Sequence, residues 1–590
     1  MTGLTVYVFF ATWCVPCRQE MPHIARLARE WRGVRFVLVA EDGPSTASQV
    51  PAFLKSFAIE AEVRRDPESE LLARYQPEGS LPFAALVEEG GSVLWSHAGY
   101  QPGDERKLEA ALAAQSAPAA AAASITSSTL AVARRALAAE PRAAGGIERF
   151  DVAGEAGRFG FAARLDGTLL SLSGRRESDL RLEKIGATAA FGPLRLRAGD
   201  GYAAFGHGLV LSVRKIDPLG VDTTVRGGRA DVKSGPVAFT ALGGLFNPQN
   251  TDPISLRTLP DPGDLVGGAA ASEALSPELS VGQSALFLRL PSAAPDGRDV
   301  RFGVAGASID VRAAHARIAA EAVGLLRRGF ALAGDEPGHG AWASASVDLG
   351  AATALLEAKW YRRFALARAE PFLAYHEPPT LERDDQAVPG NADSIGGRAR
   401  VDLRAADATT LHANAMVYRF TQDGTDPLEG GLALHAYTGA EQRFEKGSAA
   451  LSLGVRRETA PDGSLRLSFV QVNADAALPL GSQLAVSATG DVRRETKVLF
   501  SGPVGFVRGF LSAGLTFRSL ATLSLLYGYS TEAAALPVHH PGAELRIDLG
   551  RRGEVRLFAG RLLGGRVCIS GTCRDVPTFE GARLATILRF

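Results

Sequence analysis

Short runs of alternating apolar and polar residues fill the C-terminal part of the chain. In residues 543–549, Leu545, Ile547 and Leu549 fall on one face, and the positions between them are charged. Two further runs of the same kind follow before the C-terminus. A period of two residues is typical of β-strands with one apolar face and one wet face. The last fifty residues therefore predict antiparallel strands.

The same alternation recurs, between turns rich in Gly, Pro, Asp and Asn, over residues 147–590. Roughly 20–26 strands of about ten residues are expected, which is the strand length that crosses a membrane in a β-barrel. An ordinary soluble antiparallel sheet would alternate equally well and is the alternative. The fold class we predict is multi-domain, and its larger part, residues 147–590, is an antiparallel transmembrane β-barrel with an apolar exterior and a wet lumen.

Connections between the predicted strands fall into two sets. Short turns such as 550–553 alternate with long polar connections such as 376–394 and 531–540. Outer-membrane barrels have short turns on the periplasmic side and long loops on the outside. Both ends of the barrel, and a domain attached to its N-terminus, are therefore expected in the periplasm. The last residue, Phe590, resembles the terminal Phe of outer-membrane proteins.

Residues 1–114 follow a different pattern, which is typical of an α/β domain. Apolar strands at 5–10 and 34–40 flank a helix at 18–31, whose apolar residues recur at helical spacing. Residues 115–146 include a run of five alanines and are expected to form an Ala-rich linker. The chain is long enough for two or more such units.

A pair of cysteines separates the first predicted strand from the first predicted helix. Cys14 is expected at the helix N-terminus, where unpaired N–H groups and the helix dipole favour a thiolate. Cys17 follows one turn later, close enough to resolve a mixed disulfide with Cys14. Half of a zinc site is the alternative, but no second close Cys/His pair occurs in residues 1–114, where His23 and His97 stand alone.

The residues around this pair resemble thioredoxin-fold reductases of the TlpA/ResA type. The resemblance rests on Trp13-Cys14-Val15-Pro16-Cys17, Glu20, Pro22 and Ser80-Leu81-Pro82, and it covers about a fifth of the chain. It implies a thioredoxin fold with thiol–disulfide oxidoreductase activity. The predicted catalytic set is Cys14, Cys17, Glu20, Trp13, Pro16 and Pro82, with Cys14 and Cys17 as the redox disulfide.

The resemblance also implies individual roles. Pro82 would be a cis-proline that faces the cysteines and helps to present a partner strand. Glu20 would assist proton transfer. Val8 occupies the position where thioredoxins carry a buried aspartate, so that base is missing here. The direction of electron flow stays open, and the expected partners are periplasmic thiol or disulfide proteins.

Totals over the whole chain exclude several classes of function. The balance of 64 Lys+Arg against 64 Asp+Glu argues against nucleic-acid binding. No apolar run reaches 18 residues, so no transmembrane helix is expected. No C-x-x-C-H motif or Walker loop occurs, and we expect no cofactor and no metal. No basic segment precedes the first apolar run, so a signal peptide is not recognisable, which conflicts with an outer-membrane destination.

A second cysteine pair, Cys568 and Cys573, falls in the last predicted outer loop. We expect a structural disulfide between them, which would contribute about 2 kcal/mol because the closed loop is short. A second redox centre is the alternative.

Another resemblance, to an uncharacterised family of bacterial outer-membrane barrels, rests on glycine-rich motifs. These are Gly199-Asp200-Gly201-Tyr202, Phe205-Gly206-His207-Gly208, Asp222…Arg226-Gly227 and the segment around Cys568 and Cys573. That family implies no activity. The motifs either build turns and aromatic girdles or form a ligand site.

Three hypotheses for the function follow. In the first, the chain is an outer-membrane protein, in contact with outer-membrane lipid, that carries a periplasmic thiol–disulfide oxidoreductase. In the second, the barrel is a porin-like channel, or a sheath for a partner such as a multihaem cytochrome of an electron conduit, and the redox domain is accessory. In the third, a closed barrel only anchors the domain.

Overall fold

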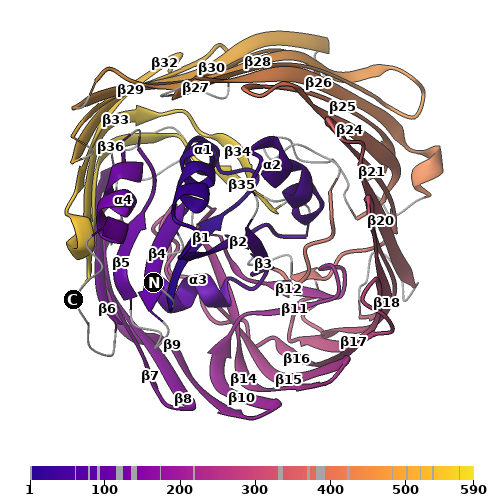
Figure 1. The fold of residues 1–590 in the computed structure, drawn as a ribbon. Helices are drawn as coiled ribbons and strands as arrows, with labels where there is room; N and C mark the ends of the chain where they lie inside the picture. The colour runs from indigo at the N-terminus through magenta and orange to yellow at the C-terminus, as the bar shows by residue number, and fades with distance from the viewer. Residues whose placement is uncertain are drawn as a thin grey trace.

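A computed structural model describes the chain except residues 1–2, 45, 60, 77–79, 89–92, 102, 114–123, 135–142, 173–174, 217–218, 295, 330–336, 369–372, 381–391, 422–425, 445–446, 482, 500–501, 519, 534–536, 570–571 and 590. It consists of a small α/β domain and a large closed barrel, and the domain lies inside the barrel (Figure 1). Phe590, the predicted aromatic end of the barrel, is outside the described residues.

The N-terminal domain is built on a mixed sheet whose described strands run in the order β3-β2-β1-β4-β5. The first three strands are parallel, and β4 and β5 are antiparallel additions. The strands are β1 (Leu4–Phe10), β2 (Arg35–Ala40), β3 (Glu62–Arg65), β4 (Phe83–Glu88) and β5 (Val93–Ala98). The helices are α1 (Val15–Glu30), α2 (Val50–Ser56), α3 (Glu70–Tyr75) and α4 (Glu105–Ala113), with a 3₁₀ turn at Ala47–Gln49.

Apolar side chains on both partners hold α1 against this sheet. Val6 and Val8 on β1 are fully buried, as are Met21 and Leu27 on α1. Each buried side chain of this size contributes about 1.5–3 kcal/mol of transfer free energy relative to exposure. The core therefore fixes the N-terminus of α1, where the cysteine pair lies. The predicted α/β thioredoxin-like fold is confirmed.

Within the described residues, 24 long antiparallel strands close into the barrel, inside the predicted range. They are β6 (Ser124–Arg134), β7 (Ala143–Ala156), β8 (Phe159–Leu172), β9 (Arg175–Phe191), β10 (Leu194–Gly201), β14 (Val221–Ser234), β15 (Val237–Pro248), β16 (Leu265–Ala274), β17 (Leu279–Leu290), β18 (Val300–Ala313), β19 (Ala316–Arg328), β20 (Gly338–Asp348), β21 (Ala352–Arg362), β24 (Ser394–Ala406), β25 (Thr409–Phe420), β26 (Gly431–Phe444), β27 (Gly447–Thr459), β28 (Leu465–Pro479), β29 (Leu484–Leu499), β30 (Gly502–Phe517), β31 (Ala521–Ser530), β32 (His539–Asp548), β33 (Gly553–Leu562) and β36 (Phe579–Arg589).

Short elements occupy the long connections. They are β11 (Ala203–Phe205), β12 (Leu211–Val213), β13 (Lys215–Ile216), β22 (Ala367–Arg368), β23 (Leu373–Ala374), β34 (Gly565–Ile569), β35 (Thr572–Val576) and the 3₁₀ turns Pro427–Glu429 and Gly550–Arg552. Side chains of β11 and β12 pack with apolar residues from the inner face of β14–β21 in one buried cluster. The long connections therefore fold inward and fill part of the lumen.

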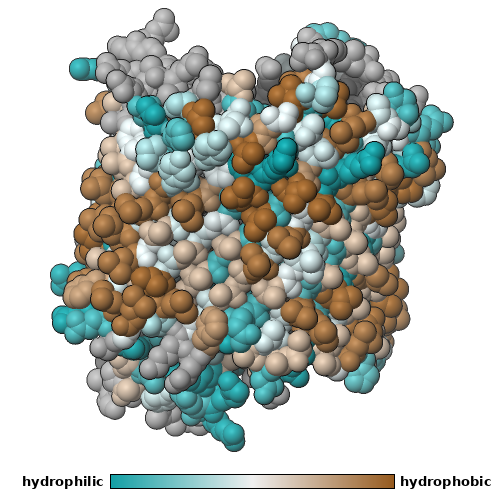
Figure 2. Space-filling view, turned by 90° about the horizontal axis from the view of Figure 1, so that it is seen from above, coloured by the Kyte–Doolittle hydropathy of each residue, from teal (hydrophilic) through white to brown (hydrophobic). Residues whose placement is uncertain are grey.

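Each wall strand alternates as the sequence predicts. On β27, Leu451, Leu453 and Val455 are 51%, 51% and 54% exposed, whereas Arg456 and Glu458 on the opposite face are buried. Apolar side chains spread over the flank of the molecule, and hydrophilic ones are more frequent toward its upper and lower ends (Figure 2). The charged face therefore points into the lumen and the apolar face points outward. Among the described residues, no helix is long and apolar enough to cross a membrane.

The barrel begins earlier in the chain than the sequence predicts. Residues 115–146 were expected to be a linker, but Ser124–Arg134 forms β6, which pairs with β36 and closes the barrel. The start of β7 also falls within the predicted linker. Small Ala, Ser and Thr side chains alternate too weakly in size and polarity to show this strand.

The position of the N-terminal domain also differs from expectation. The domain was expected on the periplasmic side of the barrel, with no position in the lumen assigned to it, and the structure places it within the ring of strands (Figure 1). Its side chains contact wall strands on several sides of the ring, from β10 to β32. The charged lumen faces that the sequence indicated as wet are thus partly covered by the charged surface of the domain.

Candidate functional site

The cysteine pair lies at the start of α1, as predicted. Cys14 is the N-cap residue, and its Sγ accepts a hydrogen bond of 3.1 Å from the backbone N–H of Cys17. The two cysteines form a disulfide, with their Cα atoms 5.2 Å apart. Cys14 is 5% exposed and Cys17 is fully buried, whereas Val15 and Pro16 between them are exposed. A helix N-terminus stabilises negative charge, so it favours the thiolate of Cys14 after reduction.

Glu20 lies behind the pair on the same face of α1. It is three residues after Cys17, the spacing that brings side chains together on a helix. Burial raises the pKa of Glu20 to about 8, and the carboxylates of Asp104 and Glu105 add to the shift. Its Oε2 is buried without a hydrogen-bond partner. Glu20 therefore holds a proton at neutral pH.

Pro82 completes the expected set. The Leu81–Pro82 peptide bond is cis, and the carbonyl of Pro82 accepts a hydrogen bond of 2.6 Å from the N–H of Gly99. Val8, which stands where thioredoxins carry an aspartate, is fully buried in the apolar core. The described geometry thus contains each residue of the predicted catalytic set, although their roles in catalysis stay predictions.

The sequence analysis missed the acidic residues that follow β2. Both the N–H and the hydroxyl of Thr12 donate to the carboxylate of Asp42, the hydroxyl at 2.5 Å. Burial raises the pKa of Asp42 to about 6, partly offset by hydrogen bonds from Thr12 and Thr46. Asp42 therefore holds the loop that carries Trp13 and Cys14. The signal for this site in the sequence was an acidic pair directly after a buried parallel strand. The carboxyl ends of parallel strands lie along one edge of the sheet, where the cysteine loop after β1 also lies.

The cysteine end of the domain faces the long connections of the barrel. Trp13 packs on Ile216 and Leu219, from the connection between β10 and β14. Pro44, after β2, lies so close to Gly208 that a Cβ there would be 2.3 Å from Pro44 Cγ. Gly208 has a φ of +90°, so this approach needs glycine.

Polar contacts connect the domain to strands around the ring. The pairs, domain residue first, are Glu70–Arg197 (β10), Glu68–Arg229 (β14), Lys55–Asp348 (β20), Ser48–Glu357 (β21), Gln49–Arg400 (β24), Arg18–Glu441 (β26), Gln101–Thr516 (β30) and Lys107–Asp548 (β32). Such contacts are weak singly but fix the orientation of the domain together. The contacts that join domain and wall are thus mostly charged rather than apolar.

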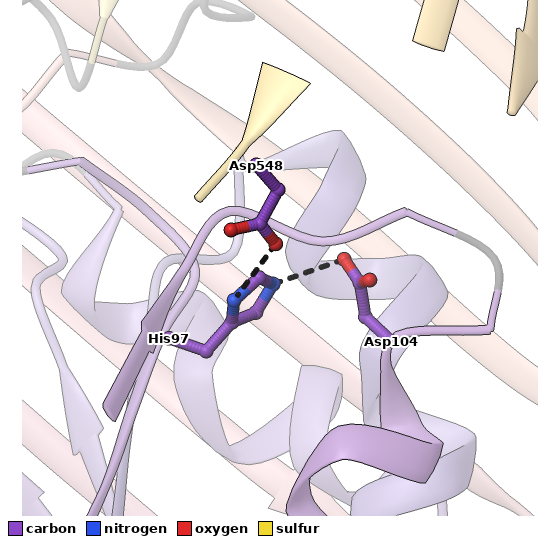
Figure 3. Close-up of side chains that lie close together, drawn as sticks. All are labelled: His97, Asp104 and Asp548. Atoms are coloured by element: carbon purple, nitrogen blue, oxygen red, sulfur yellow. Dashed lines mark hydrogen bonds and ion pairs between the residues drawn. The ribbon is translucent and has the colours of Figure 1, made fainter. Parts of the chain in front are cut away.

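One of these contacts forms a cluster of three potential metal ligands (Figure 3). Nε2 of His97 is 3.0 Å from Oδ2 of Asp104, and its Nδ1 is 3.5 Å from Oδ2 of Asp548. Nζ of Lys107 lies 2.8 Å from Asp104 and 2.5 Å from Asp548. Burial would raise the pKa of Asp104, but the hydrogen bond and charge of His97, with Lys107, hold that pKa below its usual range. Because a lysine already bridges the carboxylates, the cluster is a docking contact.

The second cysteine pair lies on the β34–β35 hairpin, where the backbones of Cys568 and Cys573 are directly opposite each other. The side chains of both residues are outside the described residues, so the structural disulfide stays a prediction. The hairpin reaches the connection above the redox site, because Nη1 of Arg574 donates to the carbonyl of Leu219 at 2.9 Å.

Two of the glycine-rich motifs, Gly199-Asp200-Gly201-Tyr202 and Asp222…Arg226-Gly227, are explained by packing in the wall. Gly199 and Gly227 lie opposite each other on β10 and β14, where a Cβ would collide with backbone at 2.2 and 2.0 Å. Asp200 pairs with Arg226 at 3.0 Å, and Asp222 pairs with Arg164 at 2.6 Å. These charges are matched by neighbours, so of the two interpretations left open the structural one accounts for the motifs.

No family model matches the chain. A thiol-disulfide oxidoreductase ResA of Bacillus cereus is 29% identical over 86 residues, which are 15% of this chain and 49% of ResA. The N-terminal region is similar to ResA-type oxidoreductases. The chain spans about half the length of the curated relatives it matches.

Solved structures resemble each part of the chain. A secreted disulfide oxidoreductase of Mycobacterium tuberculosis, homologous to DsbE of E. coli, is 20% identical and covers 19% of this chain and 81% of its own, with a TM-score of 0.17. The siderophore receptor PirA of Pseudomonas aeruginosa is 8% identical and covers 80% of this chain and 81% of its own, with a TM-score of 0.44.

Proposed function

We propose that the protein is an outer-membrane β-barrel with a thiol–disulfide oxidoreductase domain seated in its lumen. The observation that carries the proposal is the arrangement around Cys14, which caps α1 and is bonded to Cys17. Glu20 supplies a proton from behind, and cis-Pro82 lies in the same site. Similarity to ResA over the N-terminal region supports the same chemistry.

The outer surface of the barrel supports placement in a membrane. Large apolar side chains are exposed on successive strands around the ring, for example Leu356, Val417 and Leu453. Leaving so many of them in water is unfavourable, whereas a lipid environment suits an apolar exterior with a polar lumen. The short-turn end would then face the periplasm, and the cysteine end of the domain points toward the long connections.

The proposed activity is tested with the full-length protein in detergent micelles. We expect it to catalyse reduction of 2-hydroxyethyl disulfide by dithiothreitol, and we expect Cys14→Ser to abolish that catalysis. The Cys17→Ser variant should accumulate a mixed disulfide on Cys14, because no resolving thiol remains. A variant with Cys568→Ser and Cys573→Ser is the matched control and should keep the rate within about twofold. Full activity of Cys14→Ser would refute the proposal.

A second candidate function is conduction of a solute through the lumen. The observation in its favour is that the domain contacts the wall mainly through charged and polar side chains, which rehydrate at low cost when separated. A barrel of this size leaves an open channel when nothing fills it. Planar-bilayer conductance that rises with salt-induced release of the domain would support this function, and a silent bilayer would oppose it.

A sheath for a multihaem cytochrome is a third proposal. The N-terminal domain occupies the lumen that such a partner would enter (Figure 1), so the partner would have to displace it. Pull-down of haem proteins with the full-length chain tests this, and their absence from the eluate counts against it.

A further inference from the structure

The redox site is nearly closed to solvent. Sγ of Cys14 belongs to a residue that is only 5% exposed, so an attacking partner must press closely against the surrounding segments. Trp13 and Leu81 pack against the buried cluster that contains Cys14, and the carbonyl of Pro82 accepts a hydrogen bond from the N–H of Gly99. A protein disulfide would have to bring its own main chain against them, as a strand does when it pairs with an exposed edge.

Trp13 is covered by a connection of the barrel. Its ring packs on Ile216 and Leu219, and this connection is anchored in turn. Nη1 of Arg574, from the β34–β35 hairpin, donates to the carbonyl of Leu219, and Nη2 pairs with Asp252. Two separate long connections thus hold the cover over Trp13 in place.

The opposite side of the site is occupied by a wall residue. Nη2 of Arg546, on β32, donates a hydrogen bond of 2.9 Å to the carbonyl of Ala98. At the next residue, Gly99, a Cβ would lie 2.4 Å from the same Nη2. The carbonyl of Ala98, at the end of the edge strand β5, is therefore already bonded to the wall. Gln101, two residues on, is held by Thr516 of β30 at 2.8 Å.

Only a small part of the redox motif is exposed to solvent. Val15, at 38% exposure, and Pro16 are the exposed residues of the motif, and they stand between two buried cysteines. Arg18, one turn further along α1, is drawn to Glu441 on the wall at 3.3 Å.

We propose that, while the domain is docked, the Cys14–Cys17 pair reacts with low-molecular-weight thiols and disulfides and excludes protein substrates. Proteins would react only after the domain leaves the wall. This inference rests on the proposed oxidoreductase function and names the substrate class for the docked state.

A small disulfide, RSSR, is reduced in two steps. The thiolate of reduced Cys14 attacks one sulfur, so a Cys14–SR bond forms, the S–S bond of RSSR breaks, and RS⁻ leaves. The thiolate of Cys17 then attacks Sγ of Cys14 and releases the second RS⁻. Two electrons pass from the cysteines to RSSR, and the two thiol protons end on two molecules of RSH. A dithiol reduces the Cys14–Cys17 disulfide again and is itself oxidised.

The experiment compares full-length protein with a variant whose docking contacts are weakened. Asp348→Asn, Glu441→Gln and Asp548→Asn together remove the wall partners of Lys55, Arg18 and Lys107. The matched control is Asp296→Asn with Asp299→Asn, which breaks exposed pairs with Arg298 and Arg289 in the connection between β17 and β18. Each protein is assayed with 2-hydroxyethyl disulfide and with insulin, both driven by dithiothreitol.

We expect the weakened variant to reduce insulin at least about tenfold faster than wild type, since the rate follows the undocked fraction, with the small-disulfide rate nearly unchanged. Arg546→Ala should raise the insulin rate in part, because it frees the Ala98 carbonyl.

A labelling measurement gives an answer independent of turnover. In reduced protein lacking Cys568 and Cys573, N-ethylmaleimide should modify Cys14 readily in every variant, whereas a polyethylene-glycol maleimide of protein size should do so only after weakening.

Equal insulin rates in wild type and weakened variant, both dependent on Cys14, would overturn the inference and leave the proposed function intact. The same holds if the large maleimide labels wild type as fast as the small one. Loss of Cys14 dependence for both substrates would instead remove the proposed function. At high salt, which weakens the ionic docking contacts, a variant that the large maleimide labels but that still reduces insulin no faster than wild type would also overturn the inference.

Discussion

Lys107 and Asp548 are separated by 441 positions in the chain, and a hydrogen bond of 2.5 Å joins Nζ of the first to Oδ2 of the second. The lysine also bonds Asp104 of its own domain, and His97 lies against both carboxylates (Figure 3). The contact therefore connects the start of α4 to the end of β32 through a shared set of charges.

Replacing Asp548 by Asn should loosen the domain. The change removes the carboxylate charge that faces Lys107 and His97. Losing a charge-assisted hydrogen bond in a partly buried site costs about 1–3 kcal/mol. We expect faster limited proteolysis of the N-terminal domain in micelles, with a stronger salt dependence. Asp299→Asn, which breaks an exposed pair with Arg289, is the control. Unchanged proteolysis would show that this contact does not hold the domain.

Glu20→Gln should change how stability depends on pH. The folded-state pKa of Glu20, about 8, is above its usual value, so the folded state binds the proton more tightly. The stabilisation from this proton is complete below about pH 4.5 and is lost as the pH rises through about 8. The variant should thus be more stable than wild type at alkaline pH, by up to on the order of 3–5 kcal/mol.

The measurement is urea unfolding at several pH values between these limits. Gln cannot release a proton, so the thiol–disulfide exchange catalysed by the Cys14–Cys17 pair should also slow, by about 10²-fold or less. Parallel pH curves for the two proteins would mean that Glu20 keeps an ordinary pKa.

Asp222→Asn should destabilise the barrel wall. Arg164 is buried and bonds both Asp151, at 2.7 Å, and Asp222, at 2.6 Å, so one of its two counter-charges would be lost. Removing a partner from a buried ion pair costs about 3–5 kcal/mol. A lower urea midpoint in detergent is the expected result. Asp310→Asn, at a half-exposed site, is a milder comparison, and an equal effect of both would argue against a special role for Asp222.

Leu453→Arg should weaken insertion into lipid. Leu453 is at the middle of β27 and 51% exposed on the outer face. Arginine at the bilayer midplane of a barrel costs about 2–4 kcal/mol, and near the interface about 0–1. Leu480→Arg, at the exposed turn between β28 and β29, is the depth control. Folding into liposomes followed by urea titration measures both, and similar costs would contradict a membrane-embedded wall.

Cys568 and Cys573 should form a disulfide in the isolated protein. Their backbones are cross-strand neighbours, a separation at which Cβ atoms are close enough to be bridged. Peptide mass analysis without reduction should find the two linked. Replacing both by Ser should lower stability by about 2 kcal/mol or less, since the loop is short. Two free thiols under oxidising conditions would contradict this.

Alternation and motif spacing predict much of this molecule, because each reports a local requirement. The outer and inner faces of β27 are predicted by the alternation of apolar residues such as Leu453 with charged residues such as Arg456. The cysteine site is predicted by the spacing of Cys14, Cys17 and Glu20 over two successive turns of one helix. These features need only the neighbours of a residue along its own element. The wall, the strand range and the thioredoxin-like fold were predictable for that reason.

Docking was not predictable in this way. Arg18 and Glu441 each belong to an ordinary wet face, and nothing along the chain indicates that one neutralises the other. The same holds for Arg546 and the carbonyl of Ala98. β6 was hidden because its Ser, Thr and Ala side chains give little contrast between faces. Its assignment depends on pairing with β36, more than 400 residues away.

The docked domain has a mechanical consequence for the barrel. A closed sheet of 24 strands has a wide circumference, and bending between neighbouring strands lets such a tube flatten toward an ellipse. The domain touches β10 and β14 at one side and β26, β30 and β32 at the other (Figure 1). Contacts of the domain with opposite sides of the wall resist this flattening. The round cross-section of the barrel is therefore maintained by the domain inside it as well as by the hydrogen bonds between its strands.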